Sequence, residues 1–358
     1  MADFSAPALQ SLIRRTPTNR SLLLGASIFL STIVLYALSL YATYEIRHPL
    51  LRLIASAGNG LSIGLLFIVG HDACHQSLTN RSEVNSVLGR IAFLPSLHPY
   101  VCWKYSHNVL HHVWTNLKGS DPVYAPLTLT EYRALSPGRR YLERFQRSPI
   151  GMFLLYGRNI WWNIEIAPSK PHRTQMKRYG RYWLDLLFVV AFLVAEIGAC
   201  VSYAIYKGGA TLSVVTAALA YCVFVPFVVW NWLIGFVTFH HHTHPLAVWF
   251  DKRETWTSAK AQIHGTLHVV PPCYINALLL YILEHPAHHV DPGLPLYRLK
   301  GAQAALDSVS MRYRWSLREC AEIFRICRLY DYEKQQWLDY DGKPLSWSDS
   351  AQMTAKSN

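Results

Sequence analysis

The stretch LIASAGNGLSIGLLFIVGHDACH, residues 53 to 75, joins two unlike patterns that together decide the fold. Leu53–Gly70 has no charged residue, whereas the next five residues include two histidines four apart, His71 and His75. An apolar run of this length approaches the ~20 residues that a helix needs to cross a membrane. Because side chains four apart share one face of a helix, we expect a helix that leaves a membrane and presents two imidazoles to one site.

Three further apolar runs have the same character. Ser21–Tyr44 and Ala210–Phe239 are uncharged, and Leu186–Tyr206 has a single charged residue, Glu196. The chain of 358 residues is 51% hydrophobic and only 16% charged, where a soluble domain has about a quarter of its residues charged. One buried core helix explains one such run, but not four. We therefore predict an all-α integral membrane protein with four spans, at residues 21–44, 53–70, 186–206 and 210–239.

The basic residues predict how the chain is oriented. Fifteen Lys and Arg lie between His71 and Arg181, whereas the connectors within each pair of spans are short and have few. Because cytoplasmic segments have the excess of basic residues, we expect two helical hairpins in a bacterial inner membrane, with both termini in the cytoplasm. The net charge of +12 suits anionic lipid headgroups, so membrane lipids are expected partners and nucleic acids are not.

The predicted parts of the chain follow from these spans. They are a cytoplasmic lead-in at 1–20, a membrane domain with a cytoplasmic helical cap at 21–303, and a cytoplasmic tail at 304–358. The spacing of apolar residues and arginines in the tail predicts a helix over Ala304–Tyr330, with a frayed end after Gly342.

Histidines gather in three clusters of similar design. Besides HDACH at 71–75, the chain has HNVLHH at 107–112 and HPAHH at 285–289. Imidazole is the commonest metal ligand in proteins, and one tetrahedral ion takes four ligands. Eight ligands therefore predict two metal ions. The eight are His71, His75, His107, His111, His112, His285, His288 and His289.

The second cluster is expected to present His107 and His111 on one helix face, with His112 rotated by about 100° around an ideal helix. Outside the clusters, His264 and His268 are also four apart. We interpret these two as residues that support the ligands or lie at the surface.

Carboxylates often orient metal-bound imidazoles by accepting their second N–H. Asp72, Asp121 and Glu165 are candidates for this role, and the sequence does not rank them. Asp72 is equally suited to be a carboxylate at the start of a helix.

The three clusters, their order and their positions after the second and fourth apolar runs resemble the membrane fatty acid desaturase superfamily. The resemblance covers about Gly60 to Leu299. It is nearest to the bacterial and plant-type acyl-lipid Δ12/ω6 branch, on the strength of GHD at 70–72, THP at 243–245, and EHPAHH at 284–289 followed by PLY at 295–297. The resemblance implies that the eight histidines hold two irons. It also implies a ninth ligand after the fourth span, where the position before Thr-His-Pro favours His242.

What the resemblance implies for function is an oxidoreductase that uses dioxygen to introduce a double bond into a fatty acyl chain, at a Δ12/ω6-type position. The substrate would be a fatty acyl lipid or an acyl thioester. The chain has no G-x-G-x-x-G fingerprint and no C-x-x-C-H haem site, so an external electron donor such as ferredoxin with its reductase is implied. The aromatic-rich runs Tyr100–Tyr105 and Phe224–Phe239 either line an acyl tunnel or pack within the membrane.

One departure leaves the outcome of the reaction open. The second cluster has three residues between its first histidine and the pair, where the common desaturase pattern has two. The longer spacing occurs in related alkane monooxygenases, so a di-iron hydroxylase, an acetylenase and an alkane-type monooxygenase remain alternatives. A membrane metal transporter is a distant alternative, because transporters place ionisable ligands inside their spans, and these four apolar runs contain no histidine.

Overall fold

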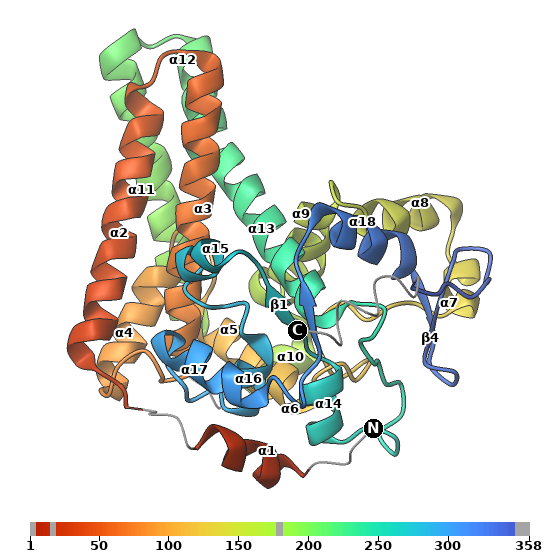
Figure 1. The fold of residues 1–358 in the computed structure, drawn as a ribbon. Coiled ribbons are helices and arrows are strands. Elements are labelled where there is room, and N and C mark those ends of the chain that lie inside the picture. Colours follow the sequence, from red (N-terminus) through yellow and green to blue (C-terminus); the bar gives the residue numbers. More distant parts are fainter. Residues whose placement is uncertain (1–4, 15–18, 177–181, 348–358) are drawn as a thin grey trace. The chain divides into compact units, whose positions relative to one another are not determined.

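The structure is a computed structural model, and it describes residues 5–14, 19–176 and 182–347 (Figure 1). The chain divides into two compact units. The first, here called the long-helix unit, consists of Arg20–Tyr105 and Tyr156–Gly235. The second, here called the histidine unit, consists of Met1–Asn19, Ser106–Leu155 and Phe236–Asn358. Outside the described residues lie parts of the predicted lead-in, cap and tail, at 1–4, 15–18, 177–181 and 348–358.

Within the described residues, four helices are long and apolar enough to cross a membrane, as predicted. All of them lie in the long-helix unit, apart from the last turns of the fourth. They are α2 (Leu22–Glu45), α3 (Pro49–Cys74), α11 (Tyr182–Gly208), and a run from Leu212 to His242 formed by α12 (Leu212–Leu219), η3 (Ala220–Phe224) and α13 (Val225–His242). The shorter helices of this unit are α4 (Ser82–Phe93), α5 (Tyr100–Trp103), η2 (Gly157–Ile166) and α10 (Lys170–Met176).

Local sequence signals account for where these helices begin. The Ser21 hydroxyl accepts a hydrogen bond from the N–H of Leu24 at 3.2 Å and so caps α2. Pro49 occupies the first turn of α3, where its missing N–H costs nothing. α3 therefore begins four residues before the predicted span, and it runs past Gly70 to Cys74.

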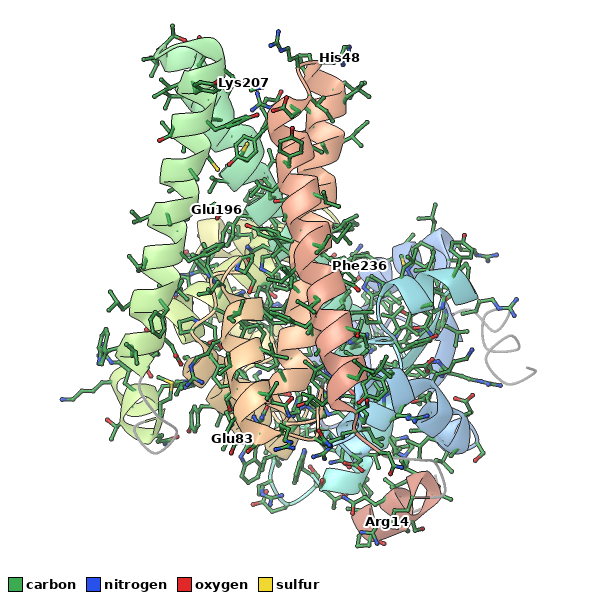
Figure 2. The ribbon with its side chains drawn as sticks, turned by 90° about the vertical axis from the view of Figure 1, so that its left-hand side faces the viewer. Arg14, His48, Glu83, Glu196, Lys207 and Phe236 are labelled. Atoms are coloured by element: carbon green, nitrogen blue, oxygen red, sulfur yellow. The ribbon has the colours of Figure 1, made fainter. Side chains whose placement is uncertain are left out.

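Figure 2 shows the long-helix unit from the side. His48, just before α3, and Lys207, near the end of α11, lie at one end of the long helices, whereas Glu83 of α4 lies at the other. Glu196 lies midway along α11, and its carboxylate accepts a hydrogen bond from the Tyr36 hydroxyl at 2.6 Å. This partner on α2 accounts for an acidic residue inside an apolar helix.

α11 begins at Tyr182, earlier than predicted, and therefore includes Asp185. The Asp185 carboxylate lies 2.8 Å from Arg90 Nε and accepts a hydrogen bond from the backbone N–H of Val101 at 2.9 Å. Because the buried charge has both partners, the first turn of α11 tolerates it.

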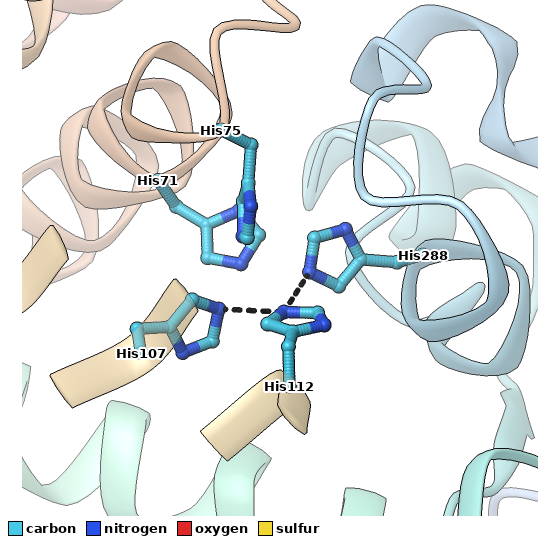
Figure 3. A group of neighbouring side chains, drawn as sticks. All are labelled: His71, His75, His107, His112 and His288. Atoms are coloured by element: carbon cyan, nitrogen blue, oxygen red, sulfur yellow. Dashed lines mark hydrogen bonds between the residues drawn. The ribbon is translucent and has the colours of Figure 1, made fainter. Parts of the chain in front are cut away.

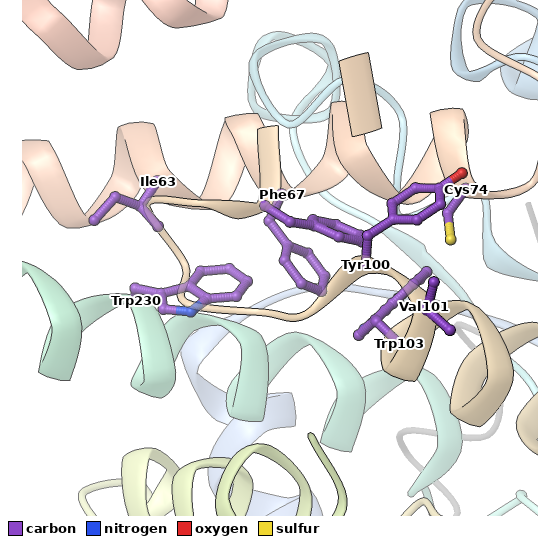
Figure 4. Packing of buried hydrophobic residues seen from close by; sticks show 8 residues of the cluster. Ile63, Phe67, Cys74, Tyr100, Val101, Trp103 and Trp230 are labelled. Atoms are coloured by element: carbon purple, nitrogen blue, oxygen red, sulfur yellow. The ribbon is translucent and has the colours of Figure 1, made fainter. Parts of the chain in front are cut away.

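An aromatic core packs against the last turns of α3 (Figure 4). The Phe67 ring lies 4.6 Å from the Trp230 ring, centroid to centroid, and the Trp103 ring stands edge-on to Phe67 at 5.4 Å. Trp103 also contacts His71 at 5.3 Å. The buried members of this core are Ile63, Phe67, Cys74, Phe93, Tyr100, Val101, Trp103 and Trp230. Packing therefore orients the end of α3 that has the first histidine cluster, and it accounts for some of the residues predicted either to pack or to line a tunnel.

The histidine unit is built from short elements. Its helices are α1 (Ala6–Ile13), η1 (Lys104–His111, which begins in the long-helix unit), α6 (His112–Trp114), α7 (Leu129–Ala134), α8 (Pro137–Gln146), α9 (Met152–Tyr156), α14 (Ser258–His264), α15 (Cys273–Leu278), α16 (His285–Val290), α17 (Leu296–Leu306) and α18 (Leu317–Ile326). Seven residues at the end of α13, from Phe236 to His242, belong to this unit as well.

Short strands correct the all-α prediction, although the chain is mostly helical. β1 (His268–Val270) pairs in parallel with β2 (Arg312–Arg314), with His268 opposite Arg312. β3 (Leu329–Asp331) pairs antiparallel with β4 (Gln336–Leu338). Strands of three residues are too short to show an alternating pattern in the sequence.

The predicted tail helix over Ala304–Tyr330 is also wrong, because β2 separates α17 from α18 within this range. Nor is the chain frayed directly after Gly342. Trp347 is buried, with its ring centroid 4.6 Å from that of His244. A contact of this kind between residues 103 positions apart has no signal in local sequence.

The close approach of α3 and α13 at Gly60 gives a test of this packing. A Cβ on Gly60 would lie 2.7 Å from Val229 Cβ and 2.8 Å from the Pro226 carbonyl oxygen. We expect Gly60→Ala to destabilise the protein by about 1–3 kcal/mol, seen as a lower Tm in detergent. Gly58→Ala, on the same helix with no atom within 4 Å of the new Cβ, is the control. Equal melting temperatures for the two variants would contradict the packing.

Candidate metal centre

Histidines of the second and third clusters meet in the histidine unit and form two groups. In each group, every histidine offers a ring nitrogen within 4.8 Å of the others. The four-histidine group consists of His111, His242, His285 and His289, all buried. The three-histidine group consists of His107, His112 and His288. The structure thus separates neighbours in sequence and joins residues far apart in the chain.

The four-histidine group has the dimensions of a coordination shell. His285 Nε2 lies 2.9 Å from His242 Nε2, and the His111 ring centroid lies 4.6 Å from that of His242. Two nitrogens that bind one ion at about 2.1 Å each lie roughly 3–4 Å apart. His285 and His289 reach the group from the same face of α16, because they are four residues apart.

Oxygen acceptors hold the second ring nitrogen of three of these histidines. His111 Nδ1 lies 2.9 Å from the Asp121 carboxylate. His242 Nδ1 lies 3.2 Å from both the Gly265 carbonyl oxygen and the Asn116 side-chain oxygen. Because carboxylate and carbonyl oxygens only accept hydrogen bonds, Nδ1 donates in both rings and Nε2 has the lone pair.

The same reasoning applies to His289. Its Nδ1 lies 3.2 Å from the Thr115 hydroxyl, which itself donates to the backbone carbonyl of His111 at 2.8 Å. The hydroxyl proton is therefore engaged, and Thr115 accepts from His289. In all three rings the Nε2 lone pair remains available to a metal ion.

The loop that follows the second cluster supplies these acceptors and is itself held by hydrogen bonds. Asp121 accepts from the backbone N–H groups of Asn116 at 2.7 Å and Val123 at 2.9 Å. Asn116 has a φ of 56°, a left-handed conformation that asparagine tolerates, and its amide donates to the Val248 carbonyl at 3.0 Å. The structure thus brings Asp121 to a candidate ligand. Asp72 and Glu165, the other two candidates, lie in the long-helix unit, which also contains the first cluster.

Sequence reasoning missed Thr115 and Asn116. Their place directly after the second cluster was the only available signal, and hydroxyl and amide residues are common in loops. What identifies them is contact with histidines that are distant in the chain, at positions 289 and 242.

Electrostatics favour a neutral His285 ring. Burial lowers the pKa of His285 well below its usual value, and the neighbouring histidines, His241 and His289 first among them, lower this pKa further. A neutral imidazole is the form that binds a metal ion. His285 is therefore in its ligand form at neutral pH.

The three-histidine group is drawn in Figure 3, where dashed lines mark two contacts. His112 Nε2 lies 3.1 Å from His107 Nε2 and 3.1 Å from His288 Nε2. His288 comes from the same short helix, α16, that supplies two members of the other group. α16 therefore contributes to both groups.

The sequence predicts an α-helix that presents His107 and His111 on one face with His112 rotated away, but η1 is a π-helix, and His107 is grouped with His112. A π-helix closes its hydrogen bonds five residues back, whereas an α-helix closes them four back. Residues five apart, such as His107 and His112, therefore align as residues four apart do in an α-helix. The wider turn of the π-helix thus accommodates the additional residue of the second cluster. His111 lies in the four-histidine group.

The first cluster lies in the long-helix unit. His71 is in the last turn of α3 and His75 is its C-terminal cap. Their ring centroids are 4.8 Å apart, and each offers a nitrogen within 4.8 Å of the other (drawn in Figure 3). The pair therefore has the local geometry that the spacing predicts.

Of the histidines at and just after the end of the fourth long helix, the structure brings His242 to the four-histidine group. Successive residues of a helix are about 100° apart, so their side chains diverge. His240 Nδ1 lies 2.8 Å from the Phe236 carbonyl oxygen, and the His241 ring stacks on His285 at 4.0 Å. The His244 ring stacks on a tyrosine at position 313.

His268, predicted to be a supporting or a surface residue, is buried between two carboxylates. Its Nε2 lies 2.7 Å from Glu284 Oε2 and its Nδ1 lies 3.0 Å from Asp307 Oδ1. Burial alone would lower the pKa of His268, but the interactions with Asp307 and Glu284 outweigh it and raise this pKa to about 9. The side chain is therefore an imidazolium at neutral pH.

Known proteins resemble the chain over most of its length. The model of the fatty acid desaturase family matches residues 47–321. The chain belongs to the fatty acid desaturase family. The match includes all three histidine clusters and both groups, and it confirms the resemblance seen in the sequence. Membership supports an oxidoreductase that acts on fatty acids.

Several relatives of this desaturase family member are themselves named as desaturases. The chloroplastic omega-6 fatty acid desaturase of Brassica napus is 28% identical over 87% of this chain and 67% of its own length. The sn-1 oleoyl-lipid 12-desaturase of a Picosynechococcus strain is 28% identical over 83% of this chain and 81% of its own. The sn-1 acyl-lipid omega-3 desaturase (ferredoxin) of a Nostoc strain is 28% identical over 78% and 73%.

The contact between His111 and Asp121 predicts an effect on one metal site. Asp121→Asn removes the charge that holds His111 Nδ1–H, so we expect the affinity of the four-histidine group for a divalent metal ion to fall about 10–100-fold, with the other group unchanged. The measurement is metal titration of the metal-depleted protein in detergent. Asp251→Asn, an exposed residue, is the control. Unchanged affinity at both sites would argue against this role of Asp121.

His268 predicts a pH dependence of stability. Its pKa is about 9 in the folded protein and near its usual value of about 6.5 when unfolded. The pair of ionic contacts therefore contributes fully below pH 6.5, on the order of 3 kcal/mol, and this contribution is lost as the pH rises through 9. We expect the Tm difference between wild type and His268→Gln to be large at pH 6 and to vanish near pH 10. A constant difference would refute the assignment.

Proposed function

We propose that this protein is a membrane di-iron enzyme that introduces a double bond into a fatty acyl chain at a Δ12/ω6-type position. One observation carries the proposal: four buried imidazoles converge, and oxygen acceptors fix the Nδ1–H of three of them. Family membership and the names of the relatives support the fatty acyl substrate and the position of the double bond.

The proposed ligands are the nine histidines that the sequence predicts. One ion would be held by the four-histidine group. The other would be held by the three-histidine group together with the first cluster, His71 and His75. This second assignment is supported by the local geometry of each cluster and by the family's pattern of three histidine clusters.

The donor set fits iron. All proposed ligands are imidazole nitrogens, and imidazole suits iron as well as zinc and copper. Two bound irons would supply the activation of dioxygen that an unactivated C–H bond requires. Zinc has no redox chemistry, so the family's oxidative reaction favours iron.

The overall reaction balances with external electrons. One –CH₂–CH₂– unit, one dioxygen, two electrons and two protons give one –CH=CH– unit and two waters. In this scheme, Asp121, Thr115 and Asn116 keep the imidazoles oriented, so no reorganisation is needed when the metals bind. Burial of the four-histidine group excludes bulk water from the ligands.

We propose a fatty acyl lipid as substrate, with an acyl thioester as the alternative, and a ferredoxin with its reductase as electron donor. Relatives whose names contain oleoyl-lipid, acyl-lipid and ferredoxin support this choice. The net charge of +12 would also speed the encounter with an acidic carrier.

We further propose that the long helices form two hairpins in a bacterial inner membrane, with both termini and a helical cap with the metal site in the cytoplasm. The short connectors after α2 and α11 support the hairpins. The excess of basic residues between the second and third long helices supports the orientation.

Two measurements test the function. Purified protein should contain about two irons per chain, by the ligand count. Expression with a ferredoxin system in a host without polyunsaturated lipids should yield a new Δ12 double bond, located by mass spectrometry. A hydroxyl group or a triple bond in its place would favour a hydroxylase or an acetylenase. One zinc and no iron would exclude the oxidative reaction.

A single substitution ties the product to the site. His288→Ala should abolish the product and lower the iron content, because its Nε2 lies 3.1 Å from that of His112, while the protein remains in the membrane. His48→Ala, in the exposed connector before α3, is the control and should retain both. Full turnover of His288→Ala would remove this residue from the ligand set.

A further inference from the structure

A closed chain of polar contacts surrounds the start of α16, the helix of the third histidine cluster. It begins at Glu284, the N-terminal cap of α16 and the residue before His285. One Glu284 oxygen accepts from the Asn276 amide at 2.7 Å, and the other lies 2.7 Å from His268 Nε2. His268 thus connects the cap of α16 to a different part of the chain.

The chain of contacts returns to α16 through the tail. His268 Nδ1 lies 3.0 Å from Asp307, and the same Asp307 oxygen accepts from the Gln303 amide at 3.1 Å. The Gln303 side-chain oxygen accepts from the backbone N–H of Ala287 at 3.0 Å. The contacts therefore hold α16 at two residues: Glu284, which precedes His285, and Ala287, which lies between His285 and His288.

The charges of this network are paired within it. Glu284 and Asp307 have the buried imidazolium of His268 between them, and Arg312 Nη1 lies 3.5 Å from the second Asp307 oxygen. The parallel pairing of β1 with β2 places His268 opposite Arg312. Two positive groups thus face two carboxylates, which is the condition for keeping buried charges.

α16 needs external support because it is short. It has six residues, His285 to Val290, and helices of fewer than ~12 residues do not hold their shape alone. Yet it supplies His285 and His289 to one histidine group and His288 to the other. A small rotation of α16 would displace ligands of both groups at once.

We propose that His268 is a positioning residue for both metal sites: its contacts with Glu284 and Asp307 fix the rotation of α16. This inference rests on the proposed function. It distinguishes His268 from Asp121, which holds one histidine of one group. Substitution at His268 therefore has to affect two sites, and substitution at Asp121 only one.

The test is titration of the metal-depleted, full-length protein in detergent with Co(II), whose visible absorption reports the ligand geometry. His268→Gln cannot contact both carboxylates, so both sites should weaken about 10–100-fold and their absorption bands should change. Asp307→Asn keeps an acceptor for His268 Nδ1–H and should retain most of the affinity. His48→Gln, the same substitution in the exposed connector before α3, is the control.

A second variant keeps the test decisive if His268→Gln fails to fold. Gln303→Met removes the acceptor of the Ala287 N–H together with the amide that donates to Asp307 and Ser310, and it should weaken both sites in the same direction. Equal affinities and spectra at both sites in the folded variants would overturn the positioning role. Absence of metal binding by the wild type would instead overturn the proposed function, so the two failures are distinguishable.

Discussion

Neutral imidazoles with a fixed orientation are the constraint on which the histidine unit depends. A ring that is free to rotate, or that is protonated on both nitrogens, is a poor ligand. Burial favours the neutral form of His285, and the acceptors from Thr115, Asn116 and Asp121 select the Nδ1–H tautomer of His289, His242 and His111. One loop therefore sets the chemical state of ligands from three separate parts of the chain.

The signals that predicted the fold were local and periodic. Four apolar runs predicted the four long helices, because length and hydropathy are properties of a continuous segment. Histidines at helical spacing predicted where candidate ligands would lie. Strands of three residues and the break in the predicted tail helix had no such signal, since each depends on pairing with a distant segment, as β1 does with β2.

The sequence predicted which histidines belong to the site, but not how they divide into two groups. The sequence named the seven histidines of the two groups, yet it predicted that His107 shares a helix face with His111 and not with His112. Their separation depends on the winding of η1, which the side chains alone do not reveal. The sequence offered His268 only as a supporting or a surface residue, and it gave no signal for its partners Asp307 and Gln303, which lie in a segment far from the clusters.

The π-helix changes which histidines of a motif lie on the same side of the helix. Spacing along the chain and angle around the helix axis are separate quantities, and a wider turn can absorb one inserted residue without displacing the side chains that follow. The second cluster of this chain therefore differs in sequence from the common pattern, yet each of its histidines lies in one of the two groups. A search that demands a fixed gap would pass over such a chain, whereas one that allows for the angle per residue would recover it.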